Sequence, residues 1–167
     1  MARAEQLCLK TNQFNLRTQR HNRIKLEEMC QSGDFIVFIA SLKDRHGDHG
    51  NVGLVIAQKL RGIPAYFIDT FLVSCRVLGK HLESWMLSYL KKCIQEMEGK
   101  YLVGEYIPTE KNQVAGNFLT SHGFIPLNPD TIPISLVPCE SQQNQENNLL
   151  MADVGNLVIP NLEIYNA

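Results

Sequence analysis

The chain has 167 residues, of which 44% are hydrophobic, and a formal net charge of −1. This length suits one globular domain with a full core. The small net charge argues against a nucleic-acid-binding protein, because such domains usually carry a marked basic excess. The central apolar run FIVFIA is far shorter than the ~20 residues that a membrane span requires.

The N-terminus lacks the apolar core of a secretory signal. The five cysteines have no paired spacing and form no cluster with histidines at zinc-site spacing. These features indicate reduced thiols inside a cell. We therefore expect a cytoplasmic domain with no membrane segment and no metal site.

Helices and strands alternate along the first part of the chain. Helices are predicted at residues 2–14 and 23–33, with Gly33 as the C-terminal cap of the second. Buried strands are predicted at 35–42 and 51–60. The segment between them, KDRHGDHG, is polar and contains two glycines, which is typical of a hairpin turn.

A third strand is predicted at residues 65–75, followed by a helix at 80–98 whose apolar residues recur every three or four positions. A fourth strand is predicted at 101–107. The stretch KNQVAGNFLTSHGF indicates a further helix and the start of a strand, and PISLVP indicates one more strand. Antiparallel strands followed by strand–helix–strand units predict an α/β (α+β) fold with a mixed central sheet flanked by helices.

The C-terminal part of the chain changes in composition. The stretch ESQQNQENN is polar and of low complexity, which is typical of a loop or linker. We therefore expect one domain at residues 1–139. Residues 140–167 are interpreted as a polar linker and a C-terminal extension that is apolar enough to pack back.

The junction between the third strand and the helix that follows contains the motif Arg-x-x-Gly. A strand that runs into a helix leaves backbone N–H groups unpaired at the helix start, and with the helix dipole these groups form a seat for a phosphate. The predicted phosphate-binding loop consists of Arg76, Val77, Leu78, Gly79, Lys80 and His81.

Cys75 ends the third predicted strand and directly precedes this loop. One interpretation is a buried thiol at the end of a strand, since cysteine is often found in cores. The other is a nucleophile, because a neighbouring cation such as Arg76 and a nearby helix start lower the pKa of a thiol. The residues alone leave both interpretations open.

The sequence resembles known acyltransferases at several motifs. RVLGKH resembles the acyl-CoA loop of the GNAT acyltransferase superfamily, and GEYIPTEKNQVAGNFLTSHGF resembles its last helix and strand. Four motifs between residues 10 and 124 are similar, in the same order, to the GNAT-like C-terminal half of FkbH-type glyceryl transferase/phosphatases of polyketide pathways. These motifs are KTNQFNLRTQR, LKDRHGDHGNVGLVI, FLVSCRVLGK and GEYIPTEKNQVAGNFL.

This resemblance implies a GNAT-like fold and a thioester relay. A small hydroxyacyl group, glyceryl or lactyl, would pass from an acyl phosphate such as 1,3-bisphosphoglycerate to Cys75. It would then pass to the phosphopantetheine thiol of an acyl carrier protein. The haloacid-dehalogenase-type phosphatase half of the family, with its DxDx[TV] motif, does not occur in this sequence. The implied partners are therefore that phosphatase domain and the carrier protein.

One departure from the family pattern bears on the cofactor, and one bias in charge bears on the partner. The family loop has a small residue where this chain has His81, whose size favours a carrier-borne arm with one phosphate over CoA. Residues 1–30 contain six Lys or Arg against three Glu, notably Arg17, Arg20 and Arg23, which suits an acidic carrier. The alternatives are an acetyl-CoA-dependent N-acetyltransferase, or an inactive GNAT scaffold that docks a carrier.

Further candidate residues complete the predicted site. The polar segment that follows residue 10 offers uncharged donors and acceptors for acyl hydroxyls. The candidates for contact with the acyl group are Thr11, Asn12, Phe14 and Asn15. A general base for the incoming thiol is predicted at His49 or Asp48.

The resemblance to the GNAT superfamily adds three more residues. Glu105 is a candidate base or substrate contact, since the family often places a base on a neighbouring strand. Asn112 and Asn117 lie on the predicted helix where the fold often contacts the pantetheine arm.

Overall fold

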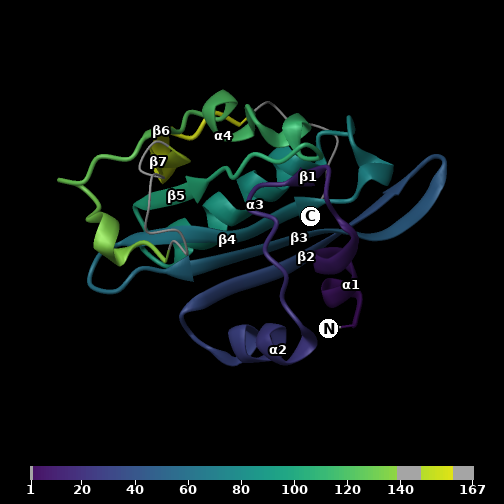
Figure 1. Ribbon diagram of the computed structural model, residues 1–167, viewed down its shortest axis with the longest axis horizontal. Helices are drawn as coiled ribbons and strands as arrows, with labels where there is room; N and C mark the ends of the chain where they lie inside the picture. The colour runs from purple at the N-terminus through teal and green to yellow at the C-terminus, as the bar shows by residue number, and fades with distance from the viewer. Residues whose placement is uncertain (1, 139–147, 160–167) are drawn as a thin grey trace.

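The computed structural model describes residues 2–138 and 148–159. A seven-stranded sheet forms its centre, with the order β2-β3-β4-β5-β7-β6 and with β1 paired to β4 beside this path (Figure 1). The strands are β1 (Phe14–Asn15), β2 (Phe35–Asp44), β3 (Gly47–Lys59), β4 (Ala65–Val73), β5 (Tyr101–Glu105), β6 (Ile125–Pro126) and β7 (Leu149–Asp153). The helices are α1 (Ala2–Lys10), α2 (Arg23–Gln31), α3 (Leu82–Glu96) and α4 (Phe118–Ser121). Short 3₁₀ turns are η1 (Cys75–Val77), η2 (Gln113–Ala115), η3 (Ile134–Leu136) and η5 (Val154–Asn156).

Among the described strands, β4 and β5 form the parallel pair, and α3 makes the crossover between them, as parallel strands require. Their pairing is short and stops at Phe67 opposite Val103. Beyond that point β1 lies on the free edge of β4, with Phe14 opposite Val73 and Asn15 opposite Leu72. The N-terminal segment therefore fills the space where the two parallel strands part.

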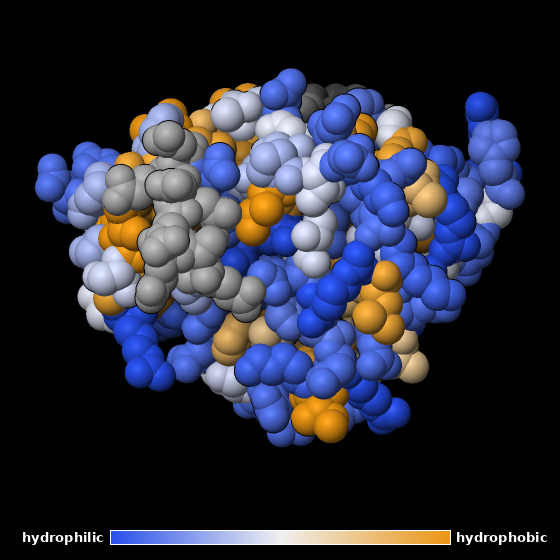
Figure 2. Space-filling model, viewed as in Figure 1, coloured by the Kyte–Doolittle hydropathy of each residue, from blue (hydrophilic) through white to orange (hydrophobic). Residues whose placement is uncertain are grey.

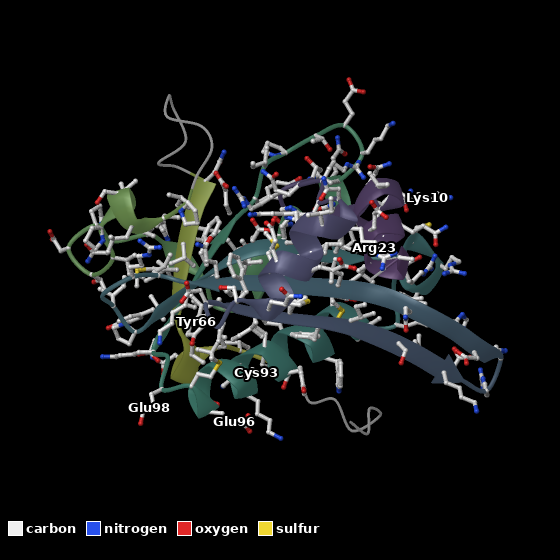
Figure 3. All side chains as sticks on the ribbon, turned by 90° about the horizontal axis from the view of Figure 1, so that it is seen from below. Lys10, Arg23, Tyr66, Cys93, Glu96 and Glu98 are labelled. Atoms are coloured by element: carbon white, nitrogen blue, oxygen red, sulfur yellow. The ribbon has the colours of Figure 1, made fainter. Side chains whose placement is uncertain are left out.

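Two layers of helices cover the sheet. Figure 3 shows α3 below the sheet, with Cys93 on it, and α1 and α2 above. The side of α3 that faces the sheet is fully buried, as the three-and-four spacing predicts, and it consists of Leu82, Met86, Leu87, Leu90 and Ile94. On the other side a second cluster joins α1 and α2 to β3 and β4. Its members are Ala4, Leu7, Cys8, Leu26, Met29, Leu54, Ile56 and Leu72.

Local signals explain where the helices begin and end. Asn22 caps α2 by accepting a hydrogen bond from the backbone N–H of Lys25 at 2.9 Å. Gly99 follows α3 at a close approach, because a Cβ there would lie 2.4 Å from a methyl carbon of Ile94. Gly79 has φ +79°, a conformation that glycine adopts without strain, and it turns the chain toward α3.

The surface in the view of Figure 2 is mainly hydrophilic, with apolar side chains in small separate patches. No helix in the described ranges has the length and apolar character needed to cross a membrane.

The predicted fold class is confirmed: the described residues form a mixed sheet flanked by helices. The predicted hairpin is also confirmed, since β2 and β3 pair antiparallel from Phe35 opposite Gln58 to Asp44 opposite Gly47. The third strand ends two residues earlier than predicted, at Val73, and α3 begins at Leu82 rather than at residue 80.

Three predictions about the elements are wrong. PISLVP does not form a strand but contains the 3₁₀ turn η3, because Pro133 and Pro138 flank it and cannot donate to a ladder. The helix predicted in KNQVAGNFLTSHGF is broken into η2 and α4 around Gly116. Gly33 does not cap α2, since Ser32 occupies the cap position in an extended conformation.

The sheet also includes a strand that the sequence pattern did not indicate. β7 lies between β5 and β6, so residues 149–153 belong to the sheet although they follow the domain boundary expected at residue 139. Most of the polar stretch that precedes β7, residues 140–147, lies outside the described residues, as do residues 160–167.

Candidate functional site

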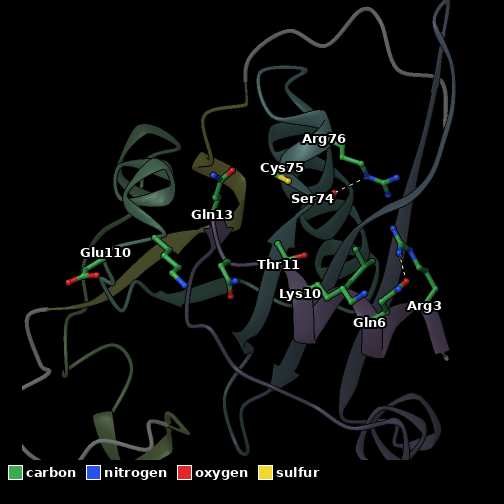
Figure 4. A pocket seen from close by; sticks show the side chains of 12 residues that line it. Arg3, Gln6, Lys10, Thr11, Gln13, Ser74, Cys75, Arg76 and Glu110 are labelled. Atoms are coloured by element: carbon green, nitrogen blue, oxygen red, sulfur yellow. Dashed lines mark hydrogen bonds between the residues drawn. The ribbon is translucent and has the colours of Figure 1, made fainter.

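A cavity of about 770 Å³ lies beside the carboxyl ends of β4 and β5. In sheets with parallel strands, ligands bind at this end of the strands. One wall comes from α1 and the segment after it, and the other comes from the β4–α3 junction and the loop after β5 (Figure 4). The lining residues are Arg3, Gln6, Leu7, Lys10, Thr11, Asn12, Gln13, Ser74, Cys75, Arg76, Glu110 and Lys111.

Cys75 is an exposed residue of the cavity wall. The interpretation as a buried thiol is therefore wrong. The chain leaves the sheet at Ser74, whose backbone N–H still donates to the carbonyl of Val52 at 2.7 Å, and it then enters the turn η1. That turn carries the thiol of Cys75 out of the core and toward the α1 wall (Figure 4).

The helix start that was expected to activate Cys75 is farther away than the sequence suggested. α3 begins at Leu82, and η1 and a turn separate it from Cys75. Arg76 is the neighbouring cation. Its Nε lies 3.5 Å from the Oγ of Ser74, and its side chain is exposed at the cavity.

The predicted phosphate-binding loop divides between the cavity and the interior. Arg76 lines the cavity, whereas Val77 is fully buried and Leu78 packs against the main core. His81 is exposed with φ +58° and makes no side-chain cap to α3. Of the six residues predicted for the loop, Arg76 is the one that lines the cavity.

Lys80 has a partner within the protein. Its Nζ donates to the carboxylate of Asp44 at the end of β2, and His49 lies 3.1 Å from the same carboxylate oxygen. These contacts, with Lys80 as the largest cause, hold the pKa of Asp44 well below its usual range. The positive charge of Lys80 is therefore neutralised by Asp44.

The general base predicted at Asp48 or His49 is not brought to the cavity. Both residues lie on the arm that β2 and β3 form at one side of the molecule (Figure 1), and neither is part of the cavity lining. Asp48 accepts a hydrogen bond from the backbone N–H of Gly50 at 2.7 Å, which is turn chemistry. Asp48 and His49 are therefore not among the residues that share the cavity with Cys75.

The N-terminal polar segment also divides between the cavity and the interior. Thr11, Asn12 and Gln13 line the cavity. Phe14 instead packs in the core, with its ring centroid 5.2 Å from that of Phe118. Asn15 is buried and bonded locally, since its Oδ1 accepts from the backbone N–H of Thr18 at 2.9 Å.

Asn112 and Asn117, which were predicted to contact a pantetheine arm, lie outside the cavity lining. Asn112 is fully buried and works as a clamp: its Nδ2 donates to the carbonyls of Asn15 and Ile107, both at 2.9 Å. This clamp ties the inserted segment to the chain after β5. Asn117 is exposed before α4 and makes no side-chain cap.

Glu105 belongs to a buried charged cluster rather than to the cavity. Arg17 Nε donates to Glu105 Oε2 at 2.7 Å, and both side chains are at most 2% exposed. Arg17 Nη1 lies 3.5 Å from Asp69 Oδ1, and His21 Nε2 lies 2.6 Å from Asp69 Oδ2. Arg17 therefore bridges β4 and β5 just beyond the point where their pairing stops, and it is not part of a basic surface.

Asp69 carries an altered pKa in this cluster. Burial alone would raise it, but the hydrogen bond and charge of His21, with Thr70 and Arg17, outweigh burial and lower the pKa of Asp69. At Cys8, in contrast, burial is the largest influence, and the pKa of the thiol is raised. Sequence patterns did not identify Asp69, because a single acid within an apolar strand carries no periodic signal.

The cavity residues on α1 were missed although a signal exists. Arg3, Gln6, Leu7 and Lys10 recur at three- and four-residue steps, which places them on one side of a helix. Lys111 follows β5 with no pattern that marks it. In the described ranges, no group of three or more His, Cys, Asp or Glu residues is arranged to hold a metal ion.

No protein-family model matches the sequence, and a comparison with curated proteins finds no significant match. Solved structures do match. A GNAT-family acetyltransferase from Staphylococcus aureus Mu50 covers 78% of this chain and 75% of its own, with a TM-score of 0.61 and 14% identity. Tetrahymena GCN5 covers 83% of this chain and 80% of its own, with a TM-score of 0.58 and 10% identity. Rv2747 from Mycobacterium tuberculosis, solved with CoA, covers 76% and 67%, with a TM-score of 0.57 and 18% identity.

These similarities are at the level of structure, and the identities are too low to carry more than the fold. The chain has the GNAT fold, with a mixed sheet and flanking helices, as the resemblance of its motifs predicted.

Proposed function

We propose that this chain is an acyltransferase that uses a pantetheine thioester, and that acyl-CoA is the leading candidate for the acyl donor. The carrying observation is a cavity at the carboxyl ends of β4 and β5 in a GNAT fold, with Arg76 in its wall. The planar guanidinium of Arg76 suits a phosphate of the arm. The acetyltransferase names of similar structures support the reaction, and the CoA complex of Rv2747 supports the cofactor.

In direct transfer, a nucleophile of the acceptor attacks the thioester carbonyl, the carbon–sulfur bond breaks and the CoA thiolate leaves. The acceptor proton then needs a base. Among the residues that line the cavity, Glu110 is the one carboxylate and there is no histidine. The Glu110 carboxylate is turned away from the residues of α1 and the β4–α3 junction (Figure 4), so a water molecule would take the proton.

The exposure of Cys75 in the same cavity favours a second candidate, the thioester relay. The Cys75 thiolate would attack an acyl phosphate, forming a thioester and releasing inorganic phosphate. The pantetheine thiolate of an acyl carrier protein would then take the acyl group and release the Cys75 thiolate. Thr11 and Asn12 offer uncharged hydrogen-bonding groups for a glyceryl or lactyl unit.

The relay requires two partner proteins or domains. For a glyceryl unit from 1,3-bisphosphoglycerate, a haloacid-dehalogenase-type phosphatase domain would hydrolyse the phosphate ester that remains after the acyl phosphate is released. An acyl carrier protein of a cytoplasmic polyketide pathway would receive the acyl group. The basic side chains at the cavity, with the exposed Arg20 and Arg23, are the ones that would meet an acidic carrier, whereas Arg17 is buried.

Intact-protein mass spectrometry separates the two candidates. The wild type, Cys75→Ala and the exposed-thiol control Cys30→Ala are incubated with acetyl-CoA, and in parallel with 1,3-bisphosphoglycerate, the phosphatase domain and a carrier protein. The relay predicts a hydroxylamine-sensitive adduct in the second mixture that only Cys75→Ala abolishes, together with carrier loading. Direct transfer predicts CoA release with an acceptor in all three proteins.

Neither adduct nor transfer, in folded protein, would contradict both candidates. A carrier-docking scaffold without activity would then be the function to test, by measuring carrier binding directly.

A further inference from the structure

The charges that line the cavity are strongly one-sided. Four basic side chains, Arg3, Lys10, Arg76 and Lys111, face one carboxylate, Glu110. Figure 4 shows the Glu110 carboxylate turned away from the labelled residues of α1 and the β4–α3 junction. The whole chain, in contrast, has a net charge of −1. The cavity is therefore positive within a protein that is nearly neutral.

Elsewhere in the described residues, five of the bases are paired with acids. Ion pairs join Arg17 to Glu105 and Asp69, Arg23 to Glu27, Lys25 to Glu28, Lys80 to Asp44 and Lys92 to Glu96. None of the four bases of the cavity lining has an ion-pair partner among the described residues. Arg3 donates to the side-chain oxygen of Gln6 and to the carbonyl of Asn51 at 3.1 Å, which are uncharged acceptors.

The four bases come from different parts of the chain, so the single phosphate of a carrier-borne pantetheine arm does not account for all of them. Arg76 follows β4, where the pantetheine arm is proposed to lie, whereas Arg3 and Lys10 lie on α1 and Lys111 follows β5. Uncompensated cations in a partly enclosed site attract anions and repel cationic amines. Lys10 on α1 and Lys111 after β5 thus belong to two parts of the lining other than the β4–α3 junction that carries Arg76.

We infer that the second substrate of this cavity, which shares it with the pantetheine arm, is an anion such as a carboxylate or phosphate, and that Lys10 and Lys111 select it. Cationic amines are rejected. This inference rests on the proposed acyl transfer for its meaning, but the charge preference of the cavity does not depend on turnover.

Charged thiol reagents measure this preference at Cys75 directly. The alkylation rate is measured for each cysteine by peptide-resolved mass spectrometry, with anionic iodoacetate, neutral iodoacetamide and cationic bromoethylamine. Cys30, exposed on α2, serves as the internal reference. At low salt, the iodoacetate-to-iodoacetamide rate ratio at Cys75 is expected to exceed that at Cys30 by about fivefold, and the bromoethylamine ratio to fall below it. About 0.5 M salt should remove most of the difference.

The variants assign the effect to residues. The double variant Lys10→Gln/Lys111→Gln should lower the ratio at Cys75 toward that at Cys30, although Arg3 and Arg76 remain. The control Lys43→Gln/Lys59→Gln, at exposed lysines outside the lining, should leave it unchanged. Equal ratios at the two cysteines in the wild type would overturn the inference, and so would a raised ratio that the Lys10/Lys111 variant does not lower.

This outcome is distinguishable from a failure of the proposed function. If Cys75 prefers anionic reagents but the protein transfers no acyl group, the inference of an anionic ligand stands and the proposed acyl transfer fails. If the protein transfers acyl groups but Cys75 shows no preference for anionic reagents, the proposed function stands and the inference of an anionic second substrate fails.

Discussion

Two polar segments, residues 11–17 and 74–80, meet at the cavity, and each divides in the same way. The first residues of each segment line the cavity, and those that follow enter the interior. The interiors differ in character. The second segment buries the apolar side chain of Val77. The first buries the apolar Phe14 and Leu16 and, between and after them, Asn15 and Arg17 with their hydrogen bonds. Polar residues in a sequence motif can thus support a site through hydrogen bonds inside the protein and need not contact the ligand.

Arg17 and Arg76 give the largest contrast in stability between the two segments. Arg17→Met leaves Glu105 and Asp69 buried without their cation, so we expect the free energy of unfolding to fall by about 3–5 kcal/mol. Arg76→Ala, at an exposed position, should change it by less than about 0.5 kcal/mol. Urea denaturation followed by circular dichroism measures both. Equal losses in the two variants would contradict the division, and Arg17→Met/Glu105→Gln should recover part of the loss.

The clamp of the first segment can be tested in the same way. Asn112→Ala leaves the buried carbonyls of Asn15 and Ile107 without their donor, which should cost about 1–3 kcal/mol. Asn117→Ala, five residues later and exposed, is the matched control, and its effect should stay within about 0.5 kcal/mol. A destabilised Asn117→Ala with a stable Asn112→Ala would show that the clamp is misassigned.

Acid should weaken the first segment through Asp69. The pKa of Asp69 is lowered in the folded protein, so between that pKa and the unfolded value of about 3.9 the unfolded chain binds more protons. The stability that Asp69 contributes is present above about pH 4 and is lost as the pH falls through the folded pKa. Unfolding free energies measured from pH 5 to pH 2 should therefore decline less steeply in Asp69→Asn than in the wild type. An unchanged slope would contradict this role.

Arg76 should affect binding more than stability, and its effect is the smallest expected here. Arg76→Ala should weaken CoA binding by about fivefold at low salt, because it removes one exposed cation from the cavity. Isothermal titration calorimetry measures this, with Arg61→Ala as an exposed control outside the lining. If both variants bind CoA as the wild type does, Arg76 does not hold the phosphate.

Much of the sheet could be predicted from the sequence, since β2, β3, β4 and α3 have the periodicities of buried strands and of an amphipathic helix. The end of β4 was predictable to within two residues for the same reason. β7 was not, because its pattern follows a polar stretch that is typical of a linker. Its place between β5 and β6 depends on contacts that are distant in sequence.

The candidate site was predicted in part, and the errors share a cause. The sequence indicated Thr11, Asn12, Cys75 and Arg76, which line the cavity, but also Phe14, Asn15 and Asn112, which are buried. Residue type predicts hydrogen bonding but does not say whether its partner is a ligand or the protein's own backbone. Lys10 and Lys111 went unmarked, since an isolated lysine is usually a solvated surface residue.

The insertion of residues 14–16 between β4 and β5 has a consequence for the order of folding. Arg17 meets Glu105 across 88 residues, and Asn112 meets Asn15 across 97. The β2–β3 hairpin closes locally and fast, whereas contacts of this span form slowly because a long loop must close first. During synthesis the segment of residues 11–17 leaves the ribosome early and waits for β5. We therefore expect the protein to complete its cavity wall late in folding, after the β2–β3 hairpin.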